Sequence, residues 1–365
     1  MNATTEPGLY RHLDEMAPWN DELQTLEVIA VSNEAPQVKT FTFRSDNQTW
    51  FRYRPGQFIT LELPCEPEPV LRTFTLSSSP SRPLSISVTA KAQTDSLGTR
   101  WMFDNLKPGM RINAFGPSGT FSLHDHPAAK YLFISAGSGV TPMMSMLRWL
   151  NDCAPWTDVA FVSCARSPDD ALFRKELELT GNRMPGLSID FVVEERSGAE
   201  KTFGHRGRLD AVRLPLLVPD FAEREIFCCG PEPFMAAVRE MLAVSGFDMT
   251  HYHQESFGVP KAVAVETAIE TTLQSTDHDT IEVDFAGSQT KGDCLPGQTI
   301  LQTARASGVR IPAACEFGLC GTCKIRKISG EVEMNHNGGI LDHEIEDGFI
   351  LACCSRPLGP VEVEA

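Results

Sequence analysis

The side chains best suited to chemistry are four cysteines near the C-terminus of this 365-residue chain: Cys315, Cys320, Cys323 and Cys353. They are separated by four, two and twenty-nine residues. Three thiolates from one loop and a fourth from a distant segment are typical of plant-type [2Fe–2S] ligation. Gly318 and Gly321 lie within the loop, where backbone without a Cβ passes close to inorganic sulfide. The pattern predicts a cluster that transfers single electrons, and therefore an electron source elsewhere in the chain.

Zinc is the alternative occupant of this loop. Zinc ribbons usually carry two C-x2-C pairs, whereas this chain has one such pair, one cysteine before it and one remote cysteine.

The chain opens on M-N-A-T-T-E-P-G, which has no basic segment followed by an apolar run. We therefore expect no secretory signal, a cytoplasmic location and reduced thiols.

Composition and charge narrow the class of protein. The length allows two or three domains, and the hydrophobic content of 42% is ordinary for a globular protein. No apolar run approaches the roughly 18 residues that cross a membrane. The formal charge of -16 repels nucleic acid and suits docking to a basic patch on a protein, although solubility alone accounts for such a charge equally well. We expect neither nucleic acid nor a membrane as a partner.

Hydrophobic periodicity divides the chain into parts with different patterns of apolar and polar residues. The first large part has short alternating segments between Pro, Gly, Asn and Ser turns, which predicts an antiparallel β-barrel. In the second, buried strands alternate with helices, which predicts an α/β domain with a parallel sheet. The predicted boundaries are 1–25 for an N-terminal extension, 26–125 for the barrel, 126–257 for the α/β domain, 258–277 for a linker and 278–365 for the cysteine domain. The barrel strands expected are 25–31, 37–43, 56–63, 72–77 and 84–90.

One barrel strand contains Arg72-Thr73-Phe74-Thr75, a combination suited to a flavin. Arg72 offers a cation for the pyrophosphate, Phe74 a flat ring for the isoalloxazine and Thr75 a hydroxyl near N5. Alternation along a strand puts Arg72 and Phe74 on one side. Such tetrapeptides also occur in ordinary core strands, so the position directly before a nucleotide-binding part carries the prediction.

A predicted helix starts near Gly98 and Thr99, in the run S-L-G-T-R-W-M. Free N–H groups at its start would hold the second phosphate of the flavin. The region after Gly98 has room for an adenosine, which favours FAD over FMN.

A glycine-rich turn follows a buried strand and opens a helix, which is the context of a phosphate-binding turn. Its residues are Gly137, Ser138, Gly139, Val140, Thr141 and Pro142. Pro142 stands where a full dinucleotide fingerprint has its third glycine, and proline is tolerated in a first helical turn. A second junction, Cys229-Gly230-Pro231, lies at the carboxyl edge of the same predicted sheet, where such sheets bind ligands. Cys229 would face the nicotinamide; a packed thiol without a catalytic role is the alternative.

Arg166 follows a third buried strand and is placed for the adenosine part of the nucleotide. Asp169 and Asp170 nearby disfavour a 2′-phosphate, which makes NADH the expected donor. Arg166 itself would accept that phosphate, so NADPH is the alternative.

The ordered set R-T-F-T, G-S-G-V-T-P, C-G-P-E-P-F-M and C-x4-C-x2-C-x29-C resembles the ferredoxin–NAD(P) reductase superfamily with a plant-type ferredoxin fused at the C-terminus. The resemblance implies a flavin barrel, an NAD domain and an α+β ferredoxin domain of the β-grasp type, with electrons passing in that order. Glu255 and Phe257 match the family's E-x-F, which would place them near the flavin and nicotinamide; an exposed charge is the alternative for Glu255. We assign Val88 to the flavin site as well. Phe74 stands where most members have Tyr, which keeps the stacking ring and loses a hydroxyl.

Domain order and the run W-L-N-D-C-A-P-W are similar to reductase components of glycine betaine or stachydrine demethylating monooxygenases. This resemblance implies an NADH-dependent oxidoreductase that passes electrons to a Rieske-type oxygenase acting on a quaternary amine. Thr75 would position flavin N5, while Cys229 and Glu255 frame the nicotinamide. The alternatives are a reductase of the hybrid-cluster protein and a redox-sensing regulatory flavoprotein, which would turn over little NADH.

Overall fold

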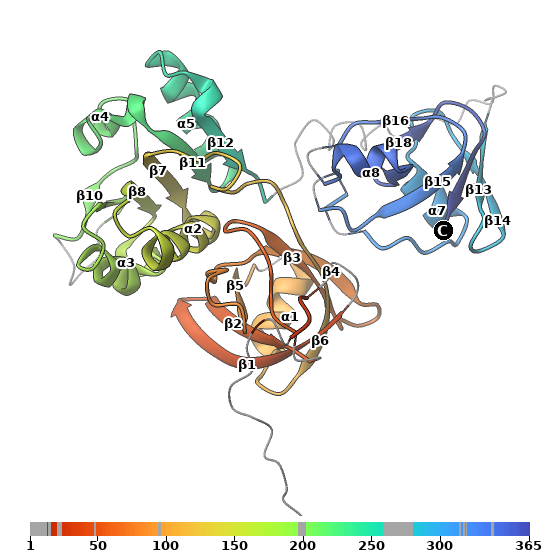
Figure 1. Cartoon of the computed structure of the whole chain (residues 1–365), viewed down its shortest axis with the longest axis horizontal. Coiled ribbons are helices and arrows are strands. Elements are labelled where there is room, and N and C mark those ends of the chain that lie inside the picture. Colours follow the sequence, from red (N-terminus) through yellow and green to blue (C-terminus); the bar gives the residue numbers. More distant parts are fainter. Residues whose placement is uncertain are drawn as a thin grey trace, which may run out of the picture.

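The barrel lies between two other sheet-based units in the computed structural model (Figure 1). The structure describes residues 13, 16–19, 24–46, 49–93, 96–195, 202–257, 280–313, 315–316, 318, 320–336 and 339–365. Most of the predicted N-terminal extension and all of the predicted linker fall outside these residues. The predicted domain boundaries therefore stay predictions.

Six antiparallel strands form the barrel, in the order β4-β3-β6-β1-β2-β5. A bridge between Leu76, just after β4, and Val88 of β5 joins the two outer strands. Alternate side chains such as Phe41, Phe43 and Leu61 fill the interior. The predicted antiparallel barrel is confirmed. The strands are β1 (Gln24–Ala35), β2 (Val38–Ser45), β3 (Phe58–Leu63), β4 (Val70–Thr75), β5 (Ile86–Lys91) and β6 (Arg111–Ser118).

Strand β6 was absent from the expected set, yet it lies between β3 and β1. Its inward positions are Ile112, Ala114 and Gly116, of which two are small and give a weak hydrophobic alternation. Helix α1 (Leu97–Asn105) follows β5, as expected for the segment after Ser96.

The second unit is a parallel sheet with strand order β10-β9-β8-β7-β11-β12. The order reverses between β7 and β11, and ligands bind at the carboxyl ends of the strands at such a point. The strands are β7 (Lys130–Ala136), β8 (Asp158–Ala165), β9 (Leu187–Val193), β10 (His205–Arg206), β11 (Glu225–Cys229) and β12 (Tyr252–Glu255). The helices are α2 (Val140–Cys153), α3 (Arg174–Gly181), α4 (Arg213–Leu217) and α5 (Glu232–Val244).

Helices cover both faces of this sheet. Phe133 of β7 packs with α2 and α3, whereas its neighbours Leu132 and Ile134 pack with α4 and α5 on the other face. Burial on both sides explains why β7 reads as a continuous apolar run rather than an alternating one. The predicted α/β domain is confirmed.

The third unit is a five-stranded mixed sheet in the order β14-β13-β19-β15-β17, with a separate β16–β18 pair. Helix α7 starts at a capping box formed by Thr299 and Gln302, and the chain turns away at Gly308 with a φ of 74°. The predicted α+β domain is confirmed. Its elements are β13 (Ile281–Phe285), β14 (Thr290–Cys294), α7 (Ile300–Ala306), β15 (Lys324–Ser329), β16 (Val332–Met334), α8 (Asp342–Glu346), β17 (Phe349–Leu351), β18 (Ser355–Pro357) and β19 (Val361–Glu364).

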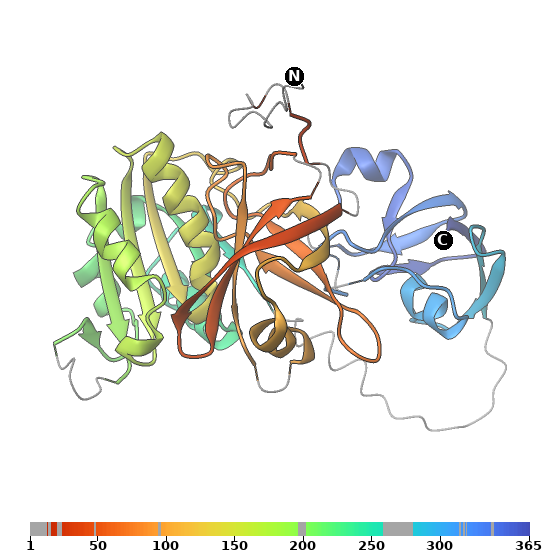
Figure 2. The ribbon, with the colours of Figure 1, turned by 90° about the horizontal axis from the view of Figure 1, so that it is seen from below.

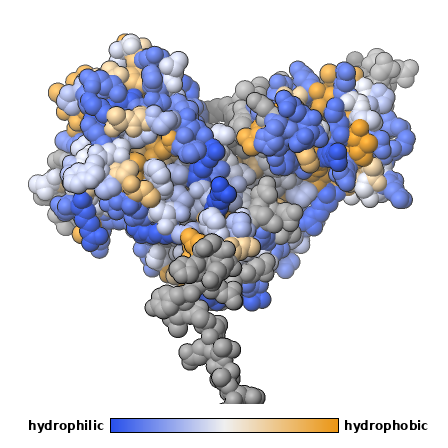
Figure 3. All heavy atoms as spheres, viewed as in Figure 1, coloured by the Kyte–Doolittle hydropathy of each residue, from blue (hydrophilic) through white to orange (hydrophobic). Residues whose placement is uncertain are grey.

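The three units follow one another in a row when seen from below, with the parallel sheet and the cysteine unit on opposite sides of the barrel (Figure 2). The face in Figure 3 is mostly hydrophilic, with apolar side chains in small groups. Among the described residues, no helix has both the length and the apolar character of a membrane span.

Candidate functional site

The four cysteines of the spaced motif converge in the third unit. Cys320, Cys323 and Cys353 are buried and Cys315 is half-buried. Backbone N–H groups point at their sulfurs: Gly318 N lies 3.2 Å from Cys353 Sγ, and Cys320 N lies 3.3 Å from Cys315 Sγ. Gly318 and Gly321 adopt φ values of 76° and 71°, which favour glycine. Four thiols with amide donors aimed at sulfur fit an iron–sulfur cluster, whose potential such donors tune.

Crowding of these thiols affects their protonation. Hydrogen bonding with Cys315 and Cys323 raises the pKa of the Cys353 thiol. Contact with Cys315 also raises the pKa of Cys320, ahead of the effect of burial. The thiols ionise when they ligate a metal, so cluster assembly relieves this crowding by releasing protons.

Arg72 lies beside the start of α1. A Cβ on Gly98 would stand 2.8 Å from Arg72 Cγ, so only glycine allows this approach. Helix α1 begins after Ser96, whose side chain accepts a hydrogen bond of 3.4 Å from Thr99 N. A guanidinium next to the first turn of a helix suits a pyrophosphate. The structure thus brings Arg72, Gly98 and Thr99 together.

Thr75, Glu255 and Cys229 meet between the barrel and the parallel sheet. Thr75 Oγ1 lies 3.3 Å from Glu255 Oε2, and Glu255 sits directly opposite Cys229 in the β11–β12 register. Glu255 is 6% exposed, and burial raises its pKa to about 8 although the Thr75 hydrogen bond opposes the shift. Burial, then the Glu255 charge, raises the pKa of the Cys229 thiol. Both side chains are mainly uncharged at neutral pH, which suits orientation of a hydride donor better than acid–base chemistry.

The glycine-rich turn packs against the end of β11. Gly137 has a φ of 55°, and a Cβ on Gly139 would stand 2.2 Å from the carbonyl oxygen of Cys229. Thr141 Oγ1 donates to Ser138 O at 3.0 Å, and Pro142 is buried in the first turn of α2. Gly230 approaches Phe234, and Pro231 precedes the first turn of α5. Two strand-to-helix turns therefore meet at the point where the strand order reverses, which fits a dinucleotide.

Sequence profiles of three families match the chain in the same order as the three units. They describe an oxidoreductase FAD-binding domain at residues 25–123, an oxidoreductase NAD-binding domain at 133–240 and a 2Fe-2S iron-sulfur cluster binding domain at 283–358. The stachydrine N-demethylase reductase subunit of Rhizobium meliloti is 49% identical, over 96% of this chain and 99% of that one. The chain belongs to the family of oxygenase reductase subunits.

The reductase is also similar to other curated proteins and to a solved structure. The glycine betaine monooxygenase reductase subunit of Pseudomonas aeruginosa is 42% identical, over 95% of this chain and 96% of that one. NADH oxidoreductase HCR of Escherichia coli is 29% identical, over 94% and 96%. The solved structure of phthalate dioxygenase reductase has the same fold, with a TM-score of 0.58 and 22% identity over 94% of this chain and 98% of that one.

The reductase is thus an oxidoreductase with FAD-binding, NAD-binding and [2Fe–2S]-binding domains, acting as an electron-transfer component of a monooxygenase system. The predicted cofactors, fold and enzyme class are confirmed. The residues described above fit these groups, because the donor types and the glycine-lined approaches lie where each group needs them.

Not all of the predicted site residues lie together. Val88 is fully buried in the barrel core, and Arg166 is exposed after β8. Phe257, beyond β12, is 49% exposed, while Phe74 is half-buried against the barrel core. Thr73 turns to the strand face opposite Phe74, where its hydroxyl lies 3.2 Å from Thr60 Oγ1. The roles assigned to these residues stay predictions.

The reductase also has a contact that the sequence did not reveal. Thr60 Oγ1 on β3 lies 3.3 Å from Thr322 Oγ1, and Thr322 directly precedes the cluster ligand Cys323. Thr73 pairs with Thr60, and Thr75 follows two residues later, about 7 Å along β4. Threonine is ordinary in a strand, so no local pattern could have marked this contact.

Proposed function

We propose that the reductase accepts hydride from NADH and supplies electrons one at a time to a Rieske-type oxygenase that demethylates a quaternary amine, with stachydrine favoured over glycine betaine. The identity of 49% to the stachydrine system's subunit, against 42% to the glycine betaine system's, supports the order of preference.

One observation carries the electron route: the β3–β4 pair contacts both redox sites. Thr75 at the end of β4 meets Glu255 of the parallel sheet, and Thr60 of β3 meets Thr322 beside the cysteine loop. The flavin, when bound, converts the two electrons of a hydride into single electrons. A strand pair shared by both sites keeps that conversion close to the cluster.

The chain's own residues position and shield the reactants in this proposal. Arg72 and the start of α1 hold the flavin pyrophosphate, and the turn at Gly139 holds the nucleotide phosphates. Thr75 orients the flavin edge through its hydroxyl. Glu255 and Cys229, both buried and mainly uncharged, frame the nicotinamide and exclude water from the transfer.

NADH and a cytoplasmic location complete the proposal. Asp169 beside Arg166 is exposed at the carboxyl end of β8, where its charge opposes a 2′-phosphate. All eleven cysteines lie in the described part of the chain and none forms a disulfide, which suits a reducing compartment.

The test combines the purified reductase with the oxygenase subunits of the stachydrine and glycine betaine systems. We expect NADH oxidation to be coupled to formaldehyde release from stachydrine, with a higher kcat/KM than for glycine betaine and a higher kcat/KM for NADH than for NADPH. Rapid cytochrome c reduction without coupling to either oxygenase would contradict the proposed partner and leave the reductase activity intact.

A further inference from the structure

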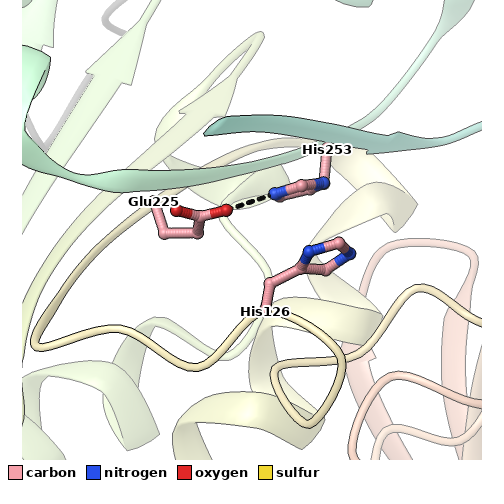
Figure 4. A group of neighbouring side chains, drawn as sticks. All are labelled: His126, Glu225 and His253. Atoms are coloured by element: carbon pink, nitrogen blue, oxygen red, sulfur yellow. Dashed lines mark hydrogen bonds and ion pairs between the residues drawn. The ribbon is translucent and has the colours of Figure 1, made fainter. Parts of the chain in front are cut away.

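A second cluster of ligating side chains lies away from the redox site: His126, Glu225 and His253 (Figure 4). One ring nitrogen from each histidine and one carboxylate oxygen all lie within 4.8 Å of one another. The two imidazole rings stack with centroids 3.5 Å apart and an interplanar angle of 22°. His253 Nε2 lies 2.5 Å from Glu225 Oε1.

The cluster is at the edge of the parallel sheet opposite the nucleotide site. Glu225 is the first residue of β11 and His253 pairs with Phe227 near the start of β12. Cys229 ends β11, about 13 Å from Glu225 along the strand. His126 belongs to the segment that leads from β6 to β7, that is, from the barrel to the sheet. Three parts of the chain that are distant in sequence therefore contribute one donor each.

Two imidazoles and one carboxylate are the protein ligands of many zinc sites, with the fourth position left to water. We propose that His126, Glu225 and His253 bind one divalent transition-metal ion of the zinc class. The ion would link the segment between β6 and β7 to the first residues of β11 and β12. This inference does not depend on the electron acceptor or on the nucleotide.

Binding such an ion requires the two rings to unstack, because an imidazole nitrogen donates in the plane of its ring and nearly parallel rings 3.5 Å apart do not direct their nitrogens at one point. Tetrahedral zinc with bonds of about 2.0–2.1 Å separates its donor atoms by about 3.3 Å. The carboxylate must therefore retreat from His253 by about 0.8 Å to admit the ion, and His126 must approach. The ion takes the place of the proton between Nε2 and Oε1: a neutral His253 keeps that proton on Nδ1, whereas an imidazolium releases it to solvent. His126 lies in a loop, and its half-buried ring contacts the rings of His253 and Phe227.

An outer hydrogen bond already orients the carboxylate. His251 Nδ1 lies 2.8 Å from Glu225 Oε2, the oxygen that is not shared with His253. Outer partners of this kind fix the direction of a ligating carboxylate. Asp125, next to His126, pairs with Arg54 of the barrel at 2.6 Å. The segment is thus tied to the barrel on one side, and the ion would tie it to the sheet on the other.

The experiment uses the reductase loaded with flavin and cluster. Wild type, His126→Gln and His253→Gln are equilibrated with a small excess of Zn²⁺, desalted and analysed for metal by mass spectrometry. The matched control is His205→Gln, because His205 Nε2 also pairs with a carboxylate, Asp190 at 3.0 Å, on the same sheet. Thiols bind zinc equally in all four proteins, so they cancel in the comparison.

We expect wild type and His205→Gln to retain one zinc equivalent more than the other two variants. Zn²⁺ should also raise the Tm of wild type and His205→Gln, and leave the Tm of His126→Gln unchanged. Flavin and cluster absorbance confirms folding, and His126→Gln, a loop substitution, decides the outcome if His253→Gln fails to fold. Equal zinc content in all proteins, or an equal Tm shift in His126→Gln, would overturn the site and leave a hydrogen-bonded cluster without an ion.

Discussion

The barrel is joined to the parallel sheet far more extensively than to the ferredoxin unit. Arg148 of α2 donates to the carbonyl oxygen of Ser77 in the barrel and pairs with Glu176 at 2.6 Å. Ser145 Oγ, one turn earlier, donates to Ser78 O at 2.8 Å and accepts from Gly56 N at 3.2 Å. The contacts with Ser77, Ser78 and Gly56 are buried or half-buried and join α2 to the barrel, whereas Glu176 belongs to α3 of the same unit as Arg148.

The contact with the ferredoxin unit is sparse. Among the described residues, polar contacts join Thr60 to Thr322 at 3.3 Å and Glu62 to Arg310 at 3.6 Å. Arg310 is 77% exposed, so this ion pair adds little stability. Hydride transfer requires reactants aligned within fractions of an ångström. Electron transfer to a cluster forms no bond between the partners, so it does not need the same alignment.

The largest effect should come from Cys320→Ser, which tests the electron carrier in the ferredoxin unit. Loss of a cluster ligand should lower NADH-dependent cytochrome c reduction by roughly 100-fold or more, because single electrons then lack their carrier. NADH-to-ferricyanide activity should remain within about twofold, since the flavin serves it directly. Cys354→Ser is the matched control, because it changes the neighbouring thiol outside the spaced motif. Unchanged cytochrome c activity in Cys320→Ser would remove the cluster from the route.

Arg148→Ala should have the next largest effect, because it weakens the interface between the barrel and the parallel-sheet unit. Loss of its hydrogen bond to Ser77 lets the sheet shift against the barrel, and NADH-to-ferricyanide activity should fall by about 10- to 100-fold. The control is Arg82→Ala, whose pairing with Asp152 also joins barrel and sheet but is 66% exposed on the arginine side. We expect less than about a threefold loss there. Equal losses in both variants would mean that the interface has no dominant contact.

Glu255→Gln tests the same interface through pH. The folded pKa of about 8 lies above the ordinary glutamate pKa of 4.5, so the folded state binds more protons than the unfolded state between these values. Stability attributable to this group is therefore full below about pH 4.5 and is lost as pH rises towards 8 and beyond, by at most roughly 5 kcal/mol. The unfolding midpoint of wild type should fall more steeply than that of Glu255→Gln between pH 5 and 8. Parallel midpoint curves would contradict the buried neutral carboxyl.

Thr322→Val should have the smallest effect and sharpens the contrast. Removing the hydroxyl contact with Thr60 should slow single-turnover reduction of the cluster by less than about threefold, because an isolated partly exposed hydrogen bond contributes little. Steady-state ferricyanide reduction should not change. A loss of tenfold or more would show that the ferredoxin contact is held as firmly as the sheet contact.

The sequence predicted what local patterns encode. Four cysteines at fixed spacing, the apolar run of β7 and the glycine turn at Gly137–Gly139 each carry their signal within a short segment, and each lies where expected. Strand β6 was not predicted because its inward residues include Ala114 and Gly116, which give a weak hydrophobic alternation. The sequence did not predict the cluster of His126, Glu225 and His253, because only the tertiary fold brings these residues together.

Register in β4 links the two half-reactions. Thr73 and Thr75 share a strand face because they are two residues apart, and one serves the contact towards the cluster while the other serves the contact towards Glu255. Deletion of one residue upstream within β4 would turn both hydroxyls inward at once. In the proposed electron route, one strand register therefore sets both the contact towards the cluster and the contact towards Glu255, so changes in the length of β4 would alter both together.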